Sequence, residues 1–337
     1  MMQDSVGFVE AEAIGYKARK ILLDRPIKRL RVLSVFEHAF YLQTQGNKLI
    51  NVIQNRNYIS PTSILVNGFN FGDFKSAGIR EGMEVRVKDN KIEIDGGFFV
   101  INLDDSSTWF TPRIPKKESI KDLRFISLNL RVLRDVIYEC TSRGGLVPLL
   151  ERVELGGPVN LFLNPLETSF SEKARPNIER LMWGLYWGDR EMFSTNAQTI
   201  LGLGPGLTPS CDDFLAGLMI SLNRGVKVVL KDEKVFFEFL KGVFAEISGE
   251  SKAKTTIYSQ AFLNLARKGE GNDIVVRLVH SLLTDHEDNV ASYSRALIEM
   301  GETSGADIAI GIYYGIRFLL SKLEHSELEM MKDLIHG

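Results

Sequence analysis

The chain has 337 residues, of which 44% are hydrophobic and 25% charged, and its formal net charge is −2. At roughly 150 residues per domain this length predicts about two domains, and the balanced charge argues against a nucleic-acid partner. No apolar run approaches the ~20 residues that cross a bilayer, and the first residues lack the pattern of a secretory signal, so we expect no membrane partner and a cytoplasmic location. The two cysteines, Cys140 and Cys211, form no CxxC pair, which disfavours a disulfide framework or a zinc ribbon.

The first part of the chain, residues 1–112, contains short segments that are typical of β-strands. The clearest hairpin, Met83–Ile94, alternates apolar with charged residues on either side of a polar turn at Lys88–Lys91. Further strands are predicted at Leu30–Phe36, Phe40–Gln43, Leu49–Ile53, Ser63–Val66 and Phe98–Leu103. Several short strands at this spacing predict a small barrel or sandwich, and Pro112 and Pro115 then indicate a linker.

Beyond the linker the hydrophobic residues recur at a helical period. Leu128, Val132 and Val136 follow one another at steps of four residues, as on one face of a helix. Further helices are predicted at Ile178–Trp187, Arg190–Ile200, Phe214–Leu222, Glu233–Ser248, Thr256–Arg267, Asp273–Leu283, Val290–Met300 and Asp307–Leu323. The predicted fold class is α+β: a β-rich, barrel- or sandwich-like N-terminal domain (1–112) followed by a mostly α-helical C-terminal domain (113–337).

A glycine-rich loop, Gly202–Gly206, precedes a predicted helix start near Ser210. Gly204 and Gly206 permit a ligand to approach the main chain closely, and the first N–H groups of a helix form an anion site. Thr208 or Ser210 is expected to cap the helix, the latter through a Ser-x-x-Asp capping box. The spacing fits neither the dinucleotide-binding nor the Walker phosphate loop. A capped helix start without any ligand is the alternative.

A second stretch repeats the pattern, because Ser304–Gly311 matches Ser210–Gly217 as Ser-x-x-Asp-x-x-x-Gly. We expect two helix starts, the second with Thr303 and Ser304, to converge on one polar ligand. A carboxylate beside an anion site is repulsive unless it binds an amide, a metal or a proton. The carboxyl groups that would hold an amide or accept a proton are those of Asp212, Asp213 and Asp307. The alternative is two capped helices that pack closely through their small residues.

A third segment, Lys252–Ser259, offers Lys254 and Thr256 as cationic and hydroxyl groups for the same anion pocket. The alternative is a helix start with exposed lysines. Asp285–Asp288 has adjacent acidic residues and a histidine, but such neighbours rarely face one ion, so we expect no metal and no cofactor. Cys211 lies near a helix start without a histidine close in sequence, which disfavours a catalytic cysteine.

Three blocks of the sequence resemble those of the AllH-like family: Gly202–Gly217, Thr255–Gly271 and Gly301–Gly315. Cys211 departs from that pattern, which commonly has glycine there. The named family member is a subunit of oxamate carbamoyltransferase, an enzyme of allantoin breakdown in purine catabolism. The resemblance implies a β-rich part followed by a helical domain, partner subunits, and interconversion of oxalurate plus phosphate with oxamate plus carbamoyl phosphate.

The residues and the resemblance together predict a subunit of a carbamoyltransferase-type enzyme that binds a small anionic metabolite. The groups expected to bind the anion or substrate belong to Gly204, Gly206, Thr208, Ser210, Lys254, Thr256, Thr303 and Ser304. The groups expected to orient or deprotonate the nitrogen substrate are Asp212, Asp213 and Asp307. The alternative is a non-catalytic subunit that binds a metabolite or serves assembly. A phosphotransferase is disfavoured because the loop lacks the usual lysine.

Overall fold

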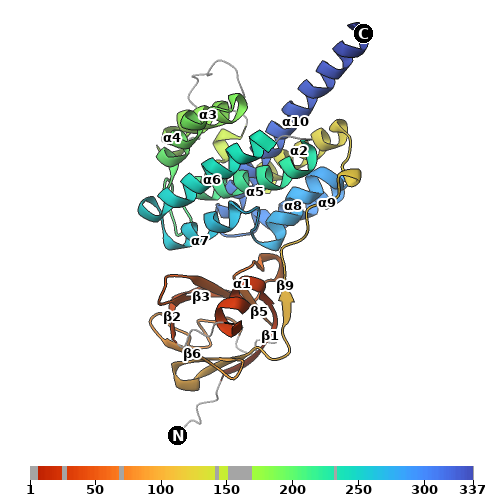
Figure 1. The fold of residues 1–337 in the computed structure, drawn as a ribbon. Coiled ribbons are helices and arrows are strands. Elements are labelled where there is room, and N and C mark those ends of the chain that lie inside the picture. Colours follow the sequence, from red (N-terminus) through yellow and green to blue (C-terminus); the bar gives the residue numbers. More distant parts are fainter. Residues whose placement is uncertain are drawn as a thin grey trace. The chain divides into compact units, whose positions relative to one another are not determined.

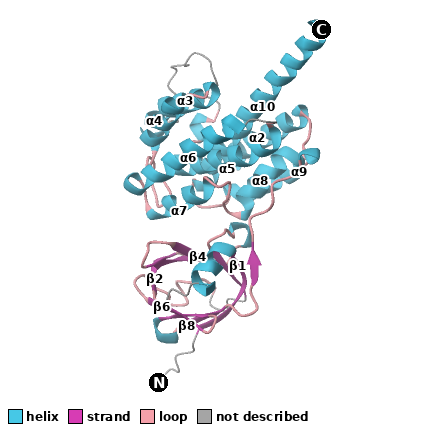
Figure 2. Ribbon diagram, in the orientation of Figure 1, coloured by secondary structure: helices cyan, strands magenta, loops and turns pink. Residues whose placement is uncertain are grey.

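The computed structural model describes residues 7–24, 29–67, 72–140, 144–150, 169–230 and 234–336. The chain divides into two compact units, Met1–Pro112 and Arg113–Gly337. The first is built of strands and the second of helices (Figures 1 and 2), so the predicted α+β class is confirmed.

The N-terminal unit is an eight-stranded β-barrel with one additional strand. Around the barrel the order is β5-β4-β3-β2-β6-β7-β8-β1, and β1 closes the ring by antiparallel pairing with β5. The additional strand, β9, runs parallel to the end of β1. The strands are β1 Gly7–Gly15, β2 Leu30–Val35, β3 Ala39–Thr44, β4 Leu49–Ile53, β5 Ser63–Asn67, β6 Glu84–Lys88, β7 Lys91–Ile94, β8 Phe99–Asn102 and β9 Ser107–Trp109. A short helix, α1 (Tyr16–Arg19), follows β1.

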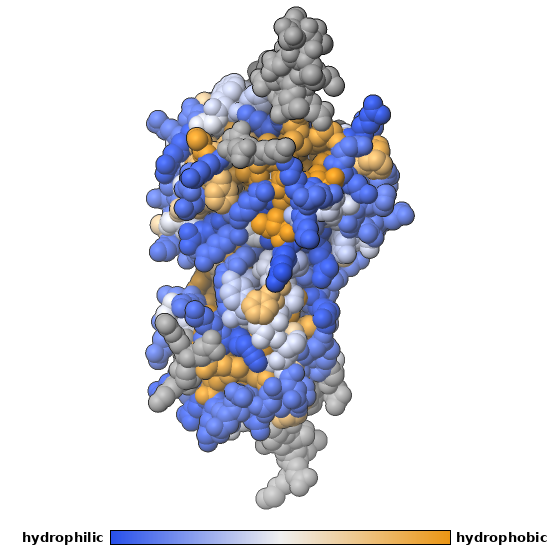
Figure 3. Space-filling model, turned by 45° about the vertical axis from the view of Figure 1, so that its right-hand side comes forward, coloured by the Kyte–Doolittle hydropathy of each residue, from blue (hydrophilic) through white to orange (hydrophobic). Residues whose placement is uncertain are grey.

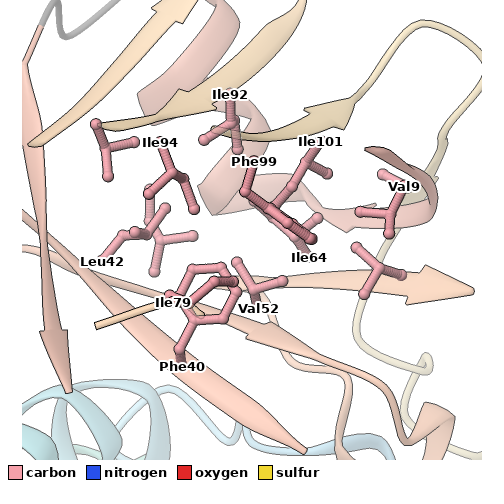
Figure 4. Packing of buried hydrophobic residues seen from close by; sticks show 14 of the residues in the cluster. Val9, Phe40, Leu42, Val52, Ile64, Ile79, Ile92, Ile94, Phe99 and Ile101 are labelled. Atoms are coloured by element: carbon pink, nitrogen blue, oxygen red, sulfur yellow. The ribbon is translucent and has the colours of Figure 1, made fainter. Parts of the chain in front are cut away.

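The hairpin of β6 and β7 illustrates why this sequence forms strands. Asp89 and Asn90 occupy its two turn positions with φ angles of +49° and +55°, a backbone conformation that these two residue types tolerate. The turn sets the register, in which Val85 lies opposite Ile94. These side chains, with Phe40 and Phe99, fill the apolar interior of the barrel (Figure 4).

The C-terminal unit consists of helices connected by short segments wherever the structure describes the connection. The helices are α2 Leu123–Cys140, α3 Ser169–Trp187, α4 Arg190–Ile200, α5 Ser210–Val229, α6 Lys234–Lys254, α7 Ile257–Ala266, α8 Asp273–Thr284, α9 Glu287–Ile298 and α10 Ser304–His336. Helix α5 lies at the centre of the unit, and each of its residues except Lys227 is buried. Its apolar run is therefore the core of the unit.

Helices α5 and α10 cross at close range because glycines line their contact. A Cβ atom added at Gly217 of α5 would lie 2.1 Å from the Ile308 carbonyl oxygen, and one added at Gly311 of α10 would lie 2.1 Å from the Phe214 carbonyl oxygen. Both gaps are too short for any side chain. This crossing holds the first turns of the two helices close to each other.

Candidate functional site

The glycine-rich loop is folded tightly against the start of α5. Gly202, Gly204 and Gly206 all have positive φ angles, of +76°, +124° and +88°. A Cβ atom at Gly202 would lie 2.2 Å from the Lys254 carbonyl oxygen, and one at Gly204 would lie 2.5 Å from the Ser210 nitrogen. Gly206 faces open space. The first two glycines thus serve close packing, whereas Gly206 leaves room at the tip of the loop.

The first turn of α5 differs from the prediction of free amides. The helix begins at Ser210 with Pro209 as its N-cap, and no side chain caps it, so neither predicted cap nor the predicted capping box forms. The Cys211 amide donates to the Leu203 carbonyl at 3.1 Å, and the amides of Asp212 and Asp213 donate to the Pro209 carbonyl at 2.9 and 3.1 Å. The bond of the Asp213 amide is the ordinary first hydrogen bond of the helix. The amides of Cys211 and Asp212, which the sequence predicted to face a ligand, are satisfied by carbonyls of the loop and of the N-cap residue.

The starts of α5 and α10 meet through side chains. The Ser304 hydroxyl donates to Oδ2 of Asp213 at 2.6 Å, and the Thr208 hydroxyl oxygen lies 3.4 Å from that of Ser304. Asp213 is only 1% exposed. Burial raises its pKa well above the ordinary value, and the nearby charges of Asp307 and Asp212 add to the rise, while the hydroxyls of Ser304 and Thr208 oppose it. A carboxyl group with a raised pKa is therefore connected to two partly exposed hydroxyls.

Asp307 lies fully buried one turn into α10. Its Oδ1 accepts the Leu146 amide at 2.7 Å, and a Cβ atom at Gly145 would lie 2.4 Å from that oxygen. Burial raises the pKa of Asp307 to about 7, against the opposing hydrogen bonds from Leu146, Ser210 and Thr303. At neutral pH this carboxyl group is consequently poised between its two protonation states.

Asp212 connects the loop to the segment between α6 and α7. Its Oδ1 accepts the Gly202 amide at 2.8 Å, and its Oδ2 accepts the Thr255 hydroxyl. Burial raises the pKa of Asp212, and its hydrogen bonds to Gly202, Thr255 and Ser259 oppose the rise. Because both of its carboxyl oxygens accept hydrogen bonds, Asp212 positions the loop.

The two groups predicted from the third segment occupy different places. The Thr256 hydroxyl caps α7, accepting the Ser259 amide at 3.2 Å, and also donates to the Leu207 carbonyl of the glycine-rich loop. The exposed Lys254 ammonium instead donates to the Gln198 carbonyl at 3.2 Å and lies 4.0 Å from Glu250. Lys254 lies at the end of α6, and α7 begins at Ile257 behind the Thr256 cap, so the segment contains a helix start beside exposed lysines, as the alternative describes. A role of Lys254 and Thr256 in an anion pocket stays a prediction.

Cys211 is buried, and burial together with the charges of Asp307 and Asp212 raises the pKa of its thiol. The thiolate form that a nucleophile requires is thus disfavoured. Gly145 and Leu146 also contact the site, through Asp307, although no predicted motif includes them. Gly145 has a φ of +57°, and the adjacent glycines Gly144 and Gly145 are the only feature of the sequence that points to a special backbone there.

In the part of the chain that the structure describes, His, Cys, Asp and Glu side chains do not gather in groups of three or more that could hold a metal ion. No described helix combines the length and the apolar character needed to cross a bilayer.

Two family profiles match the chain. The profile of the oxamate carbamoyltransferase subunit AllH matches residues 200–316, and that of the AllH family N-terminal domain matches residues 13–108. The chain belongs to the AllH family. The resemblance predicted from the three sequence blocks is thereby confirmed. No solved structure matches the chain.

The AllH profile that covers residues 200–316 includes the glycine-rich loop and both helix starts. Its description speaks of one subunit of a larger enzyme. Within this AllH-family chain, the cluster of Asp213, Ser304, Thr208 and Asp307 offers hydroxyl donors and two carboxyl groups of raised pKa, of which that of Asp307 is raised to about 7. Such groups can form hydrogen bonds with an amide and can take part in proton transfer.

Proposed function

We propose that this chain is a subunit of a carbamoyltransferase-type enzyme, related to oxamate carbamoyltransferase, whose substrates bind at the starts of α5 and α10. The observation that carries the proposal is the 2.6 Å hydrogen bond from Ser304 to the buried Asp213. This hydrogen bond connects the first turns of α5 and α10, which share the Ser-x-x-Asp pattern. The aspartate of each pattern has a raised pKa. Buried carboxyl groups with strongly raised pKa values are found preferentially at functional sites.

The reaction places definite demands on the site. The amide nitrogen of oxamate attacks the carbamoyl carbon of carbamoyl phosphate, a C–N bond forms, the bond from carbon to the phosphate oxygen breaks, and the nitrogen loses a proton. In the proposal Asp213, through Ser304, orients the nitrogen and takes up that proton. Thr208, Ser304 and the open backbone at Gly206 contact the phosphate or carboxylate group. The rate enhancement would come from positioning and electrostatics, without a covalent enzyme intermediate.

The rival function is a non-catalytic subunit that binds a metabolite or serves assembly, and two observations favour it. The amides of Cys211 and Asp212 already donate to the carbonyls of Leu203 and Pro209, which leaves fewer donors for an anion. Apolar side chains also reach the surface of both units (Figure 3), among them Phe8 of the barrel, 50% exposed, and Trp187 of the helical unit, 61% exposed. Contiguous exposed apolar patches, rather than single side chains, are typical of subunit contacts.

Purification of the native complex followed by assay of carbamoyl transfer tests the proposal directly. Asp213→Asn, placed in the complex, should lower turnover by about 10²-fold, the usual contribution of a positioned acid–base group. Asp135→Asn is the matched control, because Asp135 is an exposed aspartate on α2 that contacts Arg134. Its turnover should equal that of the unmodified complex.

Thermal unfolding of the full chain provides a second readout. Phosphate and oxamate should raise the melting temperature by mass action, and Asp213→Asn should abolish the rise produced by oxamate. Full turnover by complexes that carry Asp213→Asn or Asp307→Asn would refute the catalytic role. If in addition neither compound shifted the melting temperature, the assembly role would replace it.

A further inference from the structure

The barrel contains a cavity of its own, with a volume of about 500 Å³. It lies where β2 begins, β3 ends and β6 begins. Polar and charged side chains dominate its lining, and those that matter for its chemistry are Arg29, Arg31, Gln43, Thr44, Asn47 and Glu84. The volume falls in the range of small-molecule sites, roughly 300–1,000 Å³. Because this cavity belongs to the barrel, its role is separate from that proposed for the helical unit.

Arg31 is held in place by a neutral partner. It lies directly opposite Gln43 across the β2–β3 pair. Its Nε and Nη2 donate to Oε1 of Gln43 at 2.9 and 2.6 Å. Gln43 is 7% exposed and in turn donates from Nε2 to Oδ1 of Asn47 at 3.1 Å. The guanidinium group is thus oriented by a chain of two amides before any ligand arrives.

The charge of Arg31 has no described carboxylate within ion-pair distance, taken as 4.0 Å between nitrogen and oxygen. Its other strand neighbour, Glu84 on β6, lies 3.8 Å from Arg86 instead. Arg29 adds a second positive charge to the lining, so two cations face one carboxylate. An oriented guanidinium without a charged partner is suited to bidentate binding of a carboxylate or phosphate group.

We propose that this cavity is a second binding site, which takes a small anion with a carboxylate or phosphate group. Arg31 is the principal ligand-binding residue, and Gln43 and Asn47 position it. Arg29 contributes long-range attraction at the rim, and Glu84 limits the site to ligands of low charge through repulsion.

Nuclear magnetic resonance of the full chain with ¹⁵N-labelled arginine tests this site. The probes are potassium phosphate and potassium oxalate, each added at constant ionic strength against potassium chloride. We expect a saturable shift of the Arg31 Nε–H signal with at least one probe, and the stronger response identifies the preferred anion. Chloride should produce no saturable shift.

Three variants make the result decisive. Loss of a charged hydrogen bond costs about 1.5–3 kcal/mol, so Arg31→Gln should weaken anion binding by about tenfold or more, measured calorimetrically. Arg31→Lys keeps the charge without the planar fork and should bind with intermediate affinity. Arg56→Gln is the matched control, because Arg56 is an exposed arginine of the same unit that pairs with Glu12, and neither residue lines the cavity, so its affinity should be unchanged.

Two outcomes would overturn the site. One is a shift that grows linearly with either anion and never saturates, and the other is equal affinity in the unmodified chain, Arg31→Gln and Arg31→Lys. Asp213→Asn distinguishes this site from the one in the helical unit. Anion binding at Arg31 should persist in that variant even if carbamoyl transfer is lost, and it can fail while carbamoyl transfer is intact.

Discussion

The barrel and the helical unit bury different kinds of side chain. Among the described residues of the barrel, the buried polar groups are neutral: Ser34, Gln43, Thr44, Ser60, Ser63 and Ser106. In the helical unit the buried set also includes ionisable groups: Glu179, Asp212, Asp213, Arg224, Asp273 and Asp307. Burial of a charge is costly unless the group is paired or neutralised. Burial of ionisable groups therefore lowers the stability of the helical unit, whereas the described part of the barrel has no such buried groups.

The cost is concentrated where the two Ser-x-x-Asp helix starts meet. Burial raises the pKa of Asp213 and that of Asp307, and the nearby charge of Asp307 raises the pKa of Asp213 further. Arg224 illustrates a different solution, since it donates to the Gly269 carbonyl and to His280 at 2.8 Å each. Burial lowers the pKa of His280 to about 3, so this histidine stays neutral and accepts the hydrogen bond. Asp307, with its pKa raised to about 7, is the buried group that exchanges a proton near neutral pH.

The largest expected effect on stability concerns the apolar core of the barrel. Phe99 is fully buried in the barrel core, and Phe99→Ala should destabilise the barrel by about 3–5 kcal/mol, since it removes apolar contacts and leaves a cavity. Hydrogen exchange of peptides that cover β4 and β8 should accelerate correspondingly. A loss below about 1 kcal/mol would mean that the barrel does not depend on its apolar core.

The buried ionisable groups of the helical unit should make its stability depend on pH. The folded pKa of Asp307, about 7, exceeds its ordinary value of 3.8, so between these values the folded state binds more protons than the unfolded state. The free energy of unfolding should therefore decrease as pH rises from 4 to 7. Asp307→Asn cannot ionise and should gain stability relative to the unmodified chain across this window, by at most about 4 kcal/mol at 1.4 kcal/mol per pKa unit.

Urea unfolding at several pH values, followed by circular dichroism, measures this difference. Asp135→Asn serves as the control, because an exposed carboxyl group is hydrated in both states and its replacement should change stability only slightly at every pH. A constant difference between Asp307→Asn and the unmodified chain from pH 4 to 7 would contradict the raised pKa.

Local sequence patterns predicted the hairpin and most helices because their signals lie within a few residues. Strand β1 escaped prediction for a physical reason. Its buried positions include Ala11 and Ala13, which have a weak preference for strands, and its partners β5 and β8 are distant in sequence. Its place in the barrel is decided by pairing that no local pattern reveals.

The site was predictable to the extent that it repeats a motif. The shared Ser-x-x-Asp pattern indicated that Asp213 and Ser304 belong together, and they are hydrogen bonded. The contact of Leu146 with Asp307 joins residues 161 positions apart and depends on a glycine conformation, so the sequence alone could not indicate it. The satisfied amides of α5 were also unpredictable, because the path of the loop decides their partners.

The smallest effect concerns the crossing that brings the two helix starts together. A Cβ atom at Gly311 would lie 2.1 Å from the Phe214 carbonyl oxygen and 2.8 Å from the Leu218 nitrogen, both backbone atoms of α5 that no rotamer change can move. Gly311→Ala should therefore separate the helices and destabilise the helical unit by about 1–3 kcal/mol in urea unfolding. Gly249→Ala is the matched control, since Gly249 lies within α6 with no atom near its added Cβ. That substitution should stabilise the unit by up to about 1 kcal/mol. Equal effects of the two substitutions would mean that the close crossing, and with it the juxtaposition of Asp213 and Ser304, does not require glycine.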